Sequence, residues 1–279
     1  DVDDQAHVVR IRPGAWTIDR DLVIPSGYTV EALAPLKLSL SKGTELVSRS
    51  PLQWTGTDEM PILVTSPDSS SLGVHVIEAI GQSRLDNVHF TGLMRYTYDQ
   101  VRPAELSFHR SNVSLEHCRF TGTSATLVDL SLGEAQLRSC TFAGASDQLE
   151  LHFVRAQVSG TRFEGAKDDA VSVEGGGLSL SLSMIVGAQG VGVKATVNAK
   201  GAVSGTELKG LGIGLEGREG ASIVMTGGTL EATKAIHAGK DEMRYGTVTV
   251  ELKDVDAANA ESTSKCGTGS AGSSARGGS

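Results

Sequence analysis

The segment "HCRFTGTSATLVDLSLGEAQLRSCTFAG", residues 117–144, contains one short pattern twice. Cys118 and Phe120 recur as Cys140 and Phe142, and a Gly follows two residues after each Phe. Phe142 follows Phe120 by 22 residues. A period near 22 residues, with small residues at the turns, is typical of a solenoid built from short β-strands.

The repeat extends in both directions along the chain. Each row has an apolar residue at the Phe position, another apolar residue five positions earlier, and Gly or Ala two positions later. The Phe position reads Phe90, Phe120, Phe142, Phe163, Ile185, Leu208, Leu230 and Val255. The earlier apolar position reads Leu85, Leu115, Leu137, Val158, Leu180, Val203, Met225 and Val250. Eight rows that match at three positions predict an internal ladder of stacked side chains.

The local alternation of apolar and polar residues indicates strands. Leu149, Leu151 and Phe153 are expected to point inward, and Glu150 and His152 outward. A leucine-rich repeat is excluded, because its LxxLxL run followed by Asn and a helical return is absent. The sequence therefore predicts an all-β, right-handed, single-stranded parallel β-helix. Its coils of about 22 residues should stack about 4.8 Å apart.

The chain divides into three parts by pattern. Residues 1–84 are strand-like but less regular, and we expect them to form N-terminal capping coils that cover an exposed edge. Residues 85–257 form the regular coils. Residues 258–279 are rich in Ser, Gly and Ala, which predicts a disordered tail or linker.

Composition excludes several classes of function. The net charge of −8 argues against non-specific nucleic-acid binding and against attraction to anionic membrane surfaces. No apolar run approaches the roughly 20 residues of a membrane-spanning helix. The chain begins at Asp1, which suggests a processed form or a fragment, and we expect a secreted, periplasmic or cell-surface location. No motif for a cofactor is present, so none is expected.

The three cysteines are too few for a disulfide scaffold. Cys118 and Cys140 occupy the same position in adjacent coils, where later rows have Thr161, Ser183 and Thr206. This series of small residues favours buried structural thiols, although a disulfide between stacked cysteines is an alternative. Cys266, within the tail, is expected to be an exposed, incidental thiol.

Three runs of the chain resemble a known type of β-helix. The run "WTIDRDLVIPSGYTVEALAPLKLSLSKGTELVSRSPLQWTG" is similar to the entry segment of β-helices that accompany CotH-type proteins. The runs "GAKDDAVSVEGGGLSLSLSMIVGAQGVGV" and "LGIGLEGREGASIVMTGGTL" resemble coils of the same proteins. The resemblance implies a β-helix of the pectin-lyase-like type. Kinase activity in such proteins belongs to a separate CotH domain, and no phosphate loop or kinase motif is present here.

Outward side chains of one strand should form columns along the stack. One column is expected to hold Asp129, Glu150 and Ser172, and the neighbouring column Ser131, His152, Glu174, Lys194 and Glu216. Paired carboxylates, a base beside a carboxylate and a lysine can together support polysaccharide cleavage. The catalytic candidates are therefore Asp129, Glu150, His152, Glu174 and Lys194. The alternative is a solvated strand face on which opposite charges pair.

A second group of carboxylates lies in the turns after the Phe positions. Asp147, Asp168 and Asp169 have the spacing and donor type of a calcium site. Asp is also common in turns because its side chain bonds the local backbone. Both interpretations stay open.

The long interval from Phe90 to Phe120 predicts an inserted loop, and insertions in solenoids often lie on the binding face. A second insertion, "KDEMRYG", is shorter. Tyr rings suit sugar rings and Arg side chains suit carboxylates, although the Tyr residues could instead pack on the flank of the helix. The candidate binding residues are Arg95, Tyr96, Tyr98, Asp99, Arg102, Arg244 and Tyr245.

Together these features favour a non-enzymatic scaffold, or a module that binds a glycan or a cell-surface protein, in a secreted or cell-envelope protein. The alternative is a polysaccharide lyase or glycoside hydrolase that uses the outward carboxylates. A cleft around Glu150 favours the enzyme, and a flat exposed ladder favours the scaffold.

Overall fold

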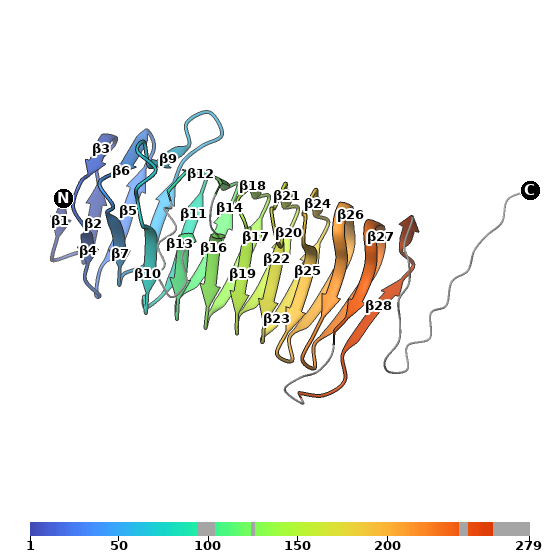
Figure 1. The fold of residues 1–279 in the computed structure, drawn as a ribbon. Coiled ribbons are helices and arrows are strands. Elements are labelled where there is room, and N and C mark those ends of the chain that lie inside the picture. Colours follow the sequence, from blue (N-terminus) through green and yellow to red (C-terminus); the bar gives the residue numbers. More distant parts are fainter. Residues whose placement is uncertain (94–103, 124–125, 240–244, 259–279) are drawn as a thin grey trace, which may run out of the picture.

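The computed structural model describes residues 1–93, 104–123, 126–239 and 245–258. These residues form an all-β solenoid in which the chain winds through three parallel sheets, with the N-terminal strands at one end and β28 at the other (Figure 1). The predicted fold class is confirmed. The described part of the chain contains no helix that is long and apolar enough to cross a membrane.

Each coil contributes one strand to each sheet. Sheet I contains β4 (Leu22–Ile24), β7 (Glu45–Ser48), β10 (Gly73–Ile77), β13 (Ala104–His109), β16 (Thr126–Ser131), β19 (Leu149–His152), β22 (Val171–Glu174), β25 (Val191–Thr196) and the last parts of β26 (Lys200–Gly217) and β27 (Ser222–Ala238). Sheet II contains β2 (Val8–Ile11), β5 (Thr29–Leu33), β8 (Leu52–Thr55), β11 (Gln82–Asp86), β14 (Asn112–Glu116), β17 (Glu134–Arg138), β20 (Arg155–Ser159), β23 (Gly177–Ser181), the first parts of β26 and β27, and β28 (Thr249–Lys253). Sheet III contains β3 (Gly14–Ile18), β6 (Leu36–Leu40), β9 (Ile62–Thr65), β12 (Val88–Thr91), β15 (Arg119–Gly122), β18 (Thr141–Gly144), β21 (Arg162–Glu164), β24 (Met184–Val186), the middle parts of β26 and β27, and β29 (Asp256–Ala258).

The N-terminal coils belong to the same three sheets as the rest. β8 pairs with β11 in parallel, so sheet II runs without a break through residue 84. Before the first coil, β1 (Val2–Asp3) pairs antiparallel with β2 and covers its edge. The expected tail is outside the described residues from 259 onward.

The aromatic ladder of sheet III is confirmed. The ring centroids of Phe90 and Phe120 are 5.2 Å apart, those of Phe120 and Phe142 are 4.9 Å apart, and those of Phe142 and Phe163 are 4.7 Å apart. Ile185 continues the row beside Phe163. All five side chains are fully buried, so the repeat found in the sequence is the core of the solenoid.

The expected alignment is wrong in the last row. Leu230 pairs with Ala257 rather than with Val255, and Met225 pairs with Leu252 rather than with Val250. A shift of two residues keeps the same face of a strand inward. The alternation of apolar and polar residues therefore could not reveal the error.

The expectation that Phe153 points inward is also wrong. Leu149 and Leu151 are buried as expected, but Phe153 is 51% exposed. β19 ends at His152, and Phe153 occupies the corner that follows, with a left-handed φ of 56°. Its ring lies over Gly175, where an added Cβ would approach ring atoms to 2.5 Å. Strand alternation ends at this corner, so it no longer predicts the direction of the side chain.

Cys118 and Cys140 are free, buried thiols, so the structural interpretation is confirmed and the disulfide is not formed. The Sγ of Cys118 lies 3.3 Å from the carbonyl oxygen of Glu116, two residues earlier. The Sγ of Cys140 lies 3.4 Å from the carbonyl oxygen of Arg138 in the same way. In the three coils after Cys140, hydroxyl groups bond to the carbonyl two residues earlier, and they belong to Thr161, Ser183 and Thr206. The column is a slot for a small donor.

Candidate functional site

The outward side chains of sheet I form two columns along the solenoid. The first contains His75, Ser107, Asp129, Glu150, Ser172, Lys194, Glu216 and His237. The second contains His109, Ser131, His152, Glu174 and Thr196. Lys194 and Glu216 thus stack beneath Asp129 and Glu150, not beneath His152 as the sequence analysis expected. This error is again a shift of two residues, which strand alternation cannot detect.

The centre of sheet I brings four of the five catalytic candidates together. His152 lies between two carboxylates, with Nδ1 2.8 Å from Oε2 of Glu174 and Nε2 3.3 Å from Oδ2 of Asp129. Glu150 pairs with Asp129 across adjacent coils, and the hydroxyl of Thr126 donates a hydrogen bond to its Oε2 at 3.1 Å. We call Asp129, Glu150, His152 and Glu174 the open cluster.

Burial distinguishes the open cluster from a solvated ladder of charges. Asp129 is only 3% exposed, and the side chain of His152 is 16% exposed. Within the described residues, the Oδ2 atom of Asp129 is buried and accepts no hydrogen bond, although Nε2 of His152 lies 3.3 Å away. Burying a carboxylate oxygen without a donor is costly, and folded proteins usually avoid it.

Lys194 does not join the open cluster. Its Nζ lies 2.8 Å from Oδ2 of Asp169. Burial lowers the pKa of Lys194, but the hydrogen bond and charge of Asp169 outweigh it, so the pKa is raised overall. A raised pKa favours the charged form of Lys194, whereas a general base needs the neutral form. The catalytic role of Lys194 stays a prediction.

Glu216, in the next coil, is fully paired. It is 1% exposed, and its carboxylate contacts the guanidinium of Arg218 at 2.9 Å and the imidazole Nδ1 of His237. We call Asp169, Lys194, Glu216, Arg218 and His237 the paired cluster. Its charges stabilise one another within sheet I.

Two of the three carboxylates of the expected calcium site, Asp147 and Asp169, bind the backbone of the turns. The Oδ1 of Asp147 accepts a hydrogen bond from the backbone N–H of Asp169 at 3.2 Å, and Oδ1 of Asp169 accepts one from Val191 at 2.9 Å. Burial raises the pKa of Asp147 to about 6, and the backbone bond from Asp169 partly offsets it. Burial also raises the pKa of Asp168. A calcium ion at this place stays a prediction.

Side chains that could bind a metal ion converge in the open cluster, and not at the expected calcium site. Within the described ranges, one group of three or more ligand-type side chains converges, and it consists of Asp129, Glu150 and His152. One donor atom from each lies within 4.8 Å of the others. The sequence analysis named all three residues, but as catalytic candidates and not as ligands.

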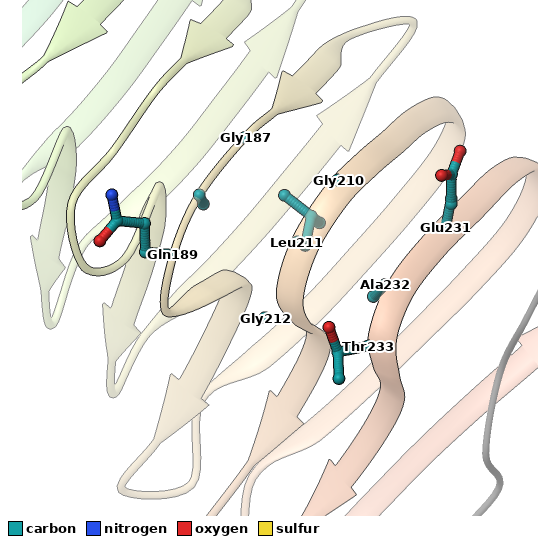
Figure 2. A pocket seen from close by; sticks show the side chains of 9 residues that line it. Gly187, Gln189, Gly210, Leu211, Gly212, Glu231, Ala232 and Thr233 are labelled. Atoms are coloured by element: carbon teal, nitrogen blue, oxygen red, sulfur yellow. The ribbon is translucent and has the colours of Figure 1, made fainter.

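A shallow hollow of ≈ 570 Å³ lies along three successive turns that lead from sheet III into sheet I. Its lining residues are Gly187, Ala188, Gln189, Gly210, Leu211, Gly212, Glu231, Ala232 and Thr233. Figure 2 shows the polar side chains of Gln189, Glu231 and Thr233 around backbone that carries only small residues at Gly187 and Gly212. Gly187 and Gly210 occupy the position two residues after the Phe position in successive repeats, and this recurrence is visible in the sequence. A hollow of ≈ 250 Å³ lies on sheet II, lined by Gln136, Arg138, Gln157, Val158, Ser159, Ser179 and Ser181.

Most of the predicted binding residues cannot be placed. Arg95, Tyr96, Tyr98, Asp99, Arg102 and Arg244 lie outside the described residues. Tyr245, before β28, is 40% exposed. Neither hollow includes Glu150. The segments that precede β13 and β16 in the chain, residues 94–103 and 124–125, are outside the described ranges. The cleft that would distinguish enzyme from scaffold is therefore untested.

No protein-family model matches the chain, and no curated protein matches it. Among solved structures, the chain is similar to the periplasmic alginate epimerase AlgG, with 10% sequence identity and a TM-score of 0.51. The alignment covers 89% of this chain and 79% of that one. A tailspike protein of bacteriophage CBA120 aligns with a TM-score of 0.37, 13% identity and coverage of 93% and 57%. The catalytic domain of a GH87 α-1,3-glucanase aligns with a TM-score of 0.42, 10% identity and coverage of 91% and 55%. At these identities the similarity establishes the β-helix fold alone, and it does not show the CotH-associated type.

Proposed function

We propose that the protein hydrolyses an uncharged polysaccharide that lies along sheet I, with the open cluster at the position of bond cleavage. The observation that carries the proposal is the buried Oδ2 of Asp129, which faces His152 and accepts no hydrogen bond from the described part of the chain. A feature that costs stability without a structural return is expected at a functional site.

The open cluster contains the groups that glycoside hydrolysis requires. One carboxyl or imidazole group must protonate the leaving oxygen, and a carboxylate must act as nucleophile or activate water. Glu150 and His152 retain exposed surface and are the groups that can reach a glycan. Glu174 holds the imidazole of His152 through Nδ1, so Nε2 is directed toward Asp129 and Glu150.

The charge of sheet I selects the class of polysaccharide. The open cluster has three carboxylates and one imidazole, and the nearby cations Lys194 and Arg218 are already paired with Asp169 and Glu216. Three converging carboxylates disfavour a polymer of uronic acids, and elimination needs a cation beside the uronate, a role for which the paired Lys194 and Arg218 are not available. Hydrolysis of a neutral glycan fits this surface better than a lyase reaction.

The hollow along the turns provides room for neighbouring sugars of the same chain. It lies beside β25, β26 and β27, whose strands continue sheet I beyond the open cluster. Small residues along its floor let a sugar ring approach the backbone. Gln189 and Thr233 offer hydrogen-bonding groups to hydroxyls.

The second candidate is a non-enzymatic module of a secreted or cell-envelope protein that binds a glycan or a cell-surface protein. It is favoured by the resemblance of residues 16–56, 165–193 and 211–230 to CotH-associated β-helices, and by the hollow, which could bind a glycan without cleaving it. The neighbour with the same fold is described as periplasmic, which fits an extracytoplasmic location.

A panel of neutral and acidic polysaccharides separates the two candidates. We expect new reducing ends from a neutral glycan, no unsaturated uronate ends, and a loss of at least about 100-fold in rate for Glu150→Gln and His152→Ala. His109→Gln, in the same column as His152, is the matched control and should keep the parent rate. Glycan binding without new reducing ends would support the non-enzymatic module. Unsaturated ends would indicate a lyase.

A further inference from the structure

We propose that Asp129, Glu150 and His152 bind a divalent transition-metal ion. The proposal goes beyond hydrolysis, since binding of the ion needs no glycan. Its first support is geometric, because one donor atom of each side chain lies within 4.8 Å of the others. A tetrahedral ion with bonds of about 2.1 Å places its ligands about 3.4 Å apart. The 3.3 Å between Nε2 of His152 and Oδ2 of Asp129 already has this spacing.

The second support is the state of Asp129. This residue is 97% buried, as its 3% exposure shows, and its Oδ2 accepts no hydrogen bond while pointing at His152. A bound cation would compensate the buried carboxylate oxygen, which lies 3.3 Å from Nε2 of His152 but accepts no hydrogen bond within the described residues. Without such an ion, burial of this oxygen lowers the free energy of unfolding.

The third support is the arrangement of Glu174. Histidines that bind metals usually donate their other ring N–H to a carboxylate, which fixes the tautomer and the direction of the ring. Glu174 accepts at Nδ1 of His152 over 2.8 Å, which leaves Nε2 as the ligand atom. Glu174 is thus a positioning residue and not a ligand.

The ligand types select the ion. Imidazole and carboxylate together suit zinc, cobalt and manganese, whereas calcium prefers six to eight oxygen ligands. Three protein ligands leave coordination positions for water or sugar hydroxyls. Ligation would occupy Nε2 of His152, so the ion would stop proton transfer by this group and regulate the hydrolysis proposed above.

The test is a metal titration of the full chain after treatment with EDTA. Co²⁺ binding is followed by visible absorption and Zn²⁺ binding by calorimetry. We expect one ion per chain with a micromolar Kd. Asp129→Asn and His152→Ala should weaken binding by about 100-fold or more, and Glu174→Gln by about 10-fold. His109→Gln again serves as the control, and thermal unfolding without metal confirms that each variant is folded.

Two results would overturn the metal site. One is the absence of saturable binding of Co²⁺ and Zn²⁺ up to millimolar concentration. The other is binding that is unchanged in both Asp129→Asn and His152→Ala, which would place the ion elsewhere, for example at Cys266. The titration contains no glycan, so a failed metal titration would not contradict the proposed hydrolysis. A failed hydrolysis assay would likewise not contradict the proposed metal site.

Discussion

The open cluster and the paired cluster occupy neighbouring coils of the same sheet, yet they differ in how their charges are compensated. In the paired cluster, Glu216 is buried between Arg218 and His237, and Asp169 is bound by Lys194. In the open cluster, three carboxylates surround one imidazole. Buried charge alone therefore does not mark a functional site in this protein. The two clusters differ in composition, because the paired cluster joins its carboxylates to Lys194 and Arg218, whereas the open cluster joins three carboxylates to one imidazole.

Sheet I contains a further buried carboxyl group, that of Glu105. This residue lies on the outward side of β13 in sheet I and is 3% exposed, and its Oε2 has no hydrogen-bond partner among the residues that the structure describes. Its Oε1 accepts the backbone N–H of Leu93 at 3.3 Å. Gly122 leaves the space for this carboxyl group, because an added Cβ would approach Oε1 to 2.4 Å. Gly122 is therefore required for space, whereas Gly144, with a φ of 74°, is required for the turn.

The largest expected effect is the pH dependence of stability due to Glu105. Burial raises the pKa of Glu105 from 4.5 to about 8, and hydrogen bonds from Leu93 and Gly92 only partly offset this. The stability that the proton provides is complete below pH 4.5 and is lost as the pH rises to about 8. Relative to Glu105→Gln, the parent should lose up to about 1.4 kcal/mol per pH unit in this window.

Urea unfolding of parent and Glu105→Gln at pH 5, 7 and 9 measures this difference. The free energy of unfolding of Glu105→Gln relative to the parent should increase with pH. At pH 9 it should exceed that of the parent by several kcal/mol. Parallel pH profiles for the two proteins would show that Glu105 is compensated like Glu216, and the contrast between these two buried carboxyl groups would disappear.

The next effect tests the paired cluster. Glu216→Gln removes the charge that Arg218 and His237 share, and it should lower the free energy of unfolding by about 3 kcal/mol. Glu207→Gln is the matched control, since Glu207 pairs with Lys209 on the same strand but is 41% exposed. The control should change stability by about 0.5 kcal/mol or less. Equal effects of the two changes would mean that burial of Glu216 adds nothing to the ion pair.

The sequence predicted the fold well because its main signal is steric. Phe120 and Phe142 must stack, and a fixed period is sufficient to find them. Where the prediction failed, at Val255 and Lys194, the error was a shift of two residues, to which strand alternation is insensitive. Phe153 failed for another reason, since a corner with positive φ follows β19 and ends the alternation.

The candidate site was predicted only as a set of residues. Asp129, Glu150, His152 and Glu174 were named, but the sequence favoured a solvated ladder of alternating charges over a site. The feature that changes this interpretation is the burial of Asp129 without a donor, which depends on packing around sheet I. No periodicity contains that information. Glu105 was missed for the same reason, as its outward position gave no sign that it would be buried.

The smallest expected effect gives the sharpest contrast between the two clusters. Asn has the shape of Asp but no charge, so Asp129→Asn removes a buried charge that accepts no hydrogen bond at Oδ2. In EDTA at pH 8 this change should leave the free energy of unfolding unaltered or raise it by up to about 1 kcal/mol. The opposite sign is expected for Glu216→Gln under the same conditions, although both residues are buried carboxylates on one sheet. Urea unfolding of the two variants beside the parent checks this. A loss of about 2 kcal/mol or more in Asp129→Asn would mean that its ion pair with His152 stabilises the fold. The open cluster would then be structural like its neighbour, and neither the hydrolysis nor the metal site would have the buried carboxylate on which both depend.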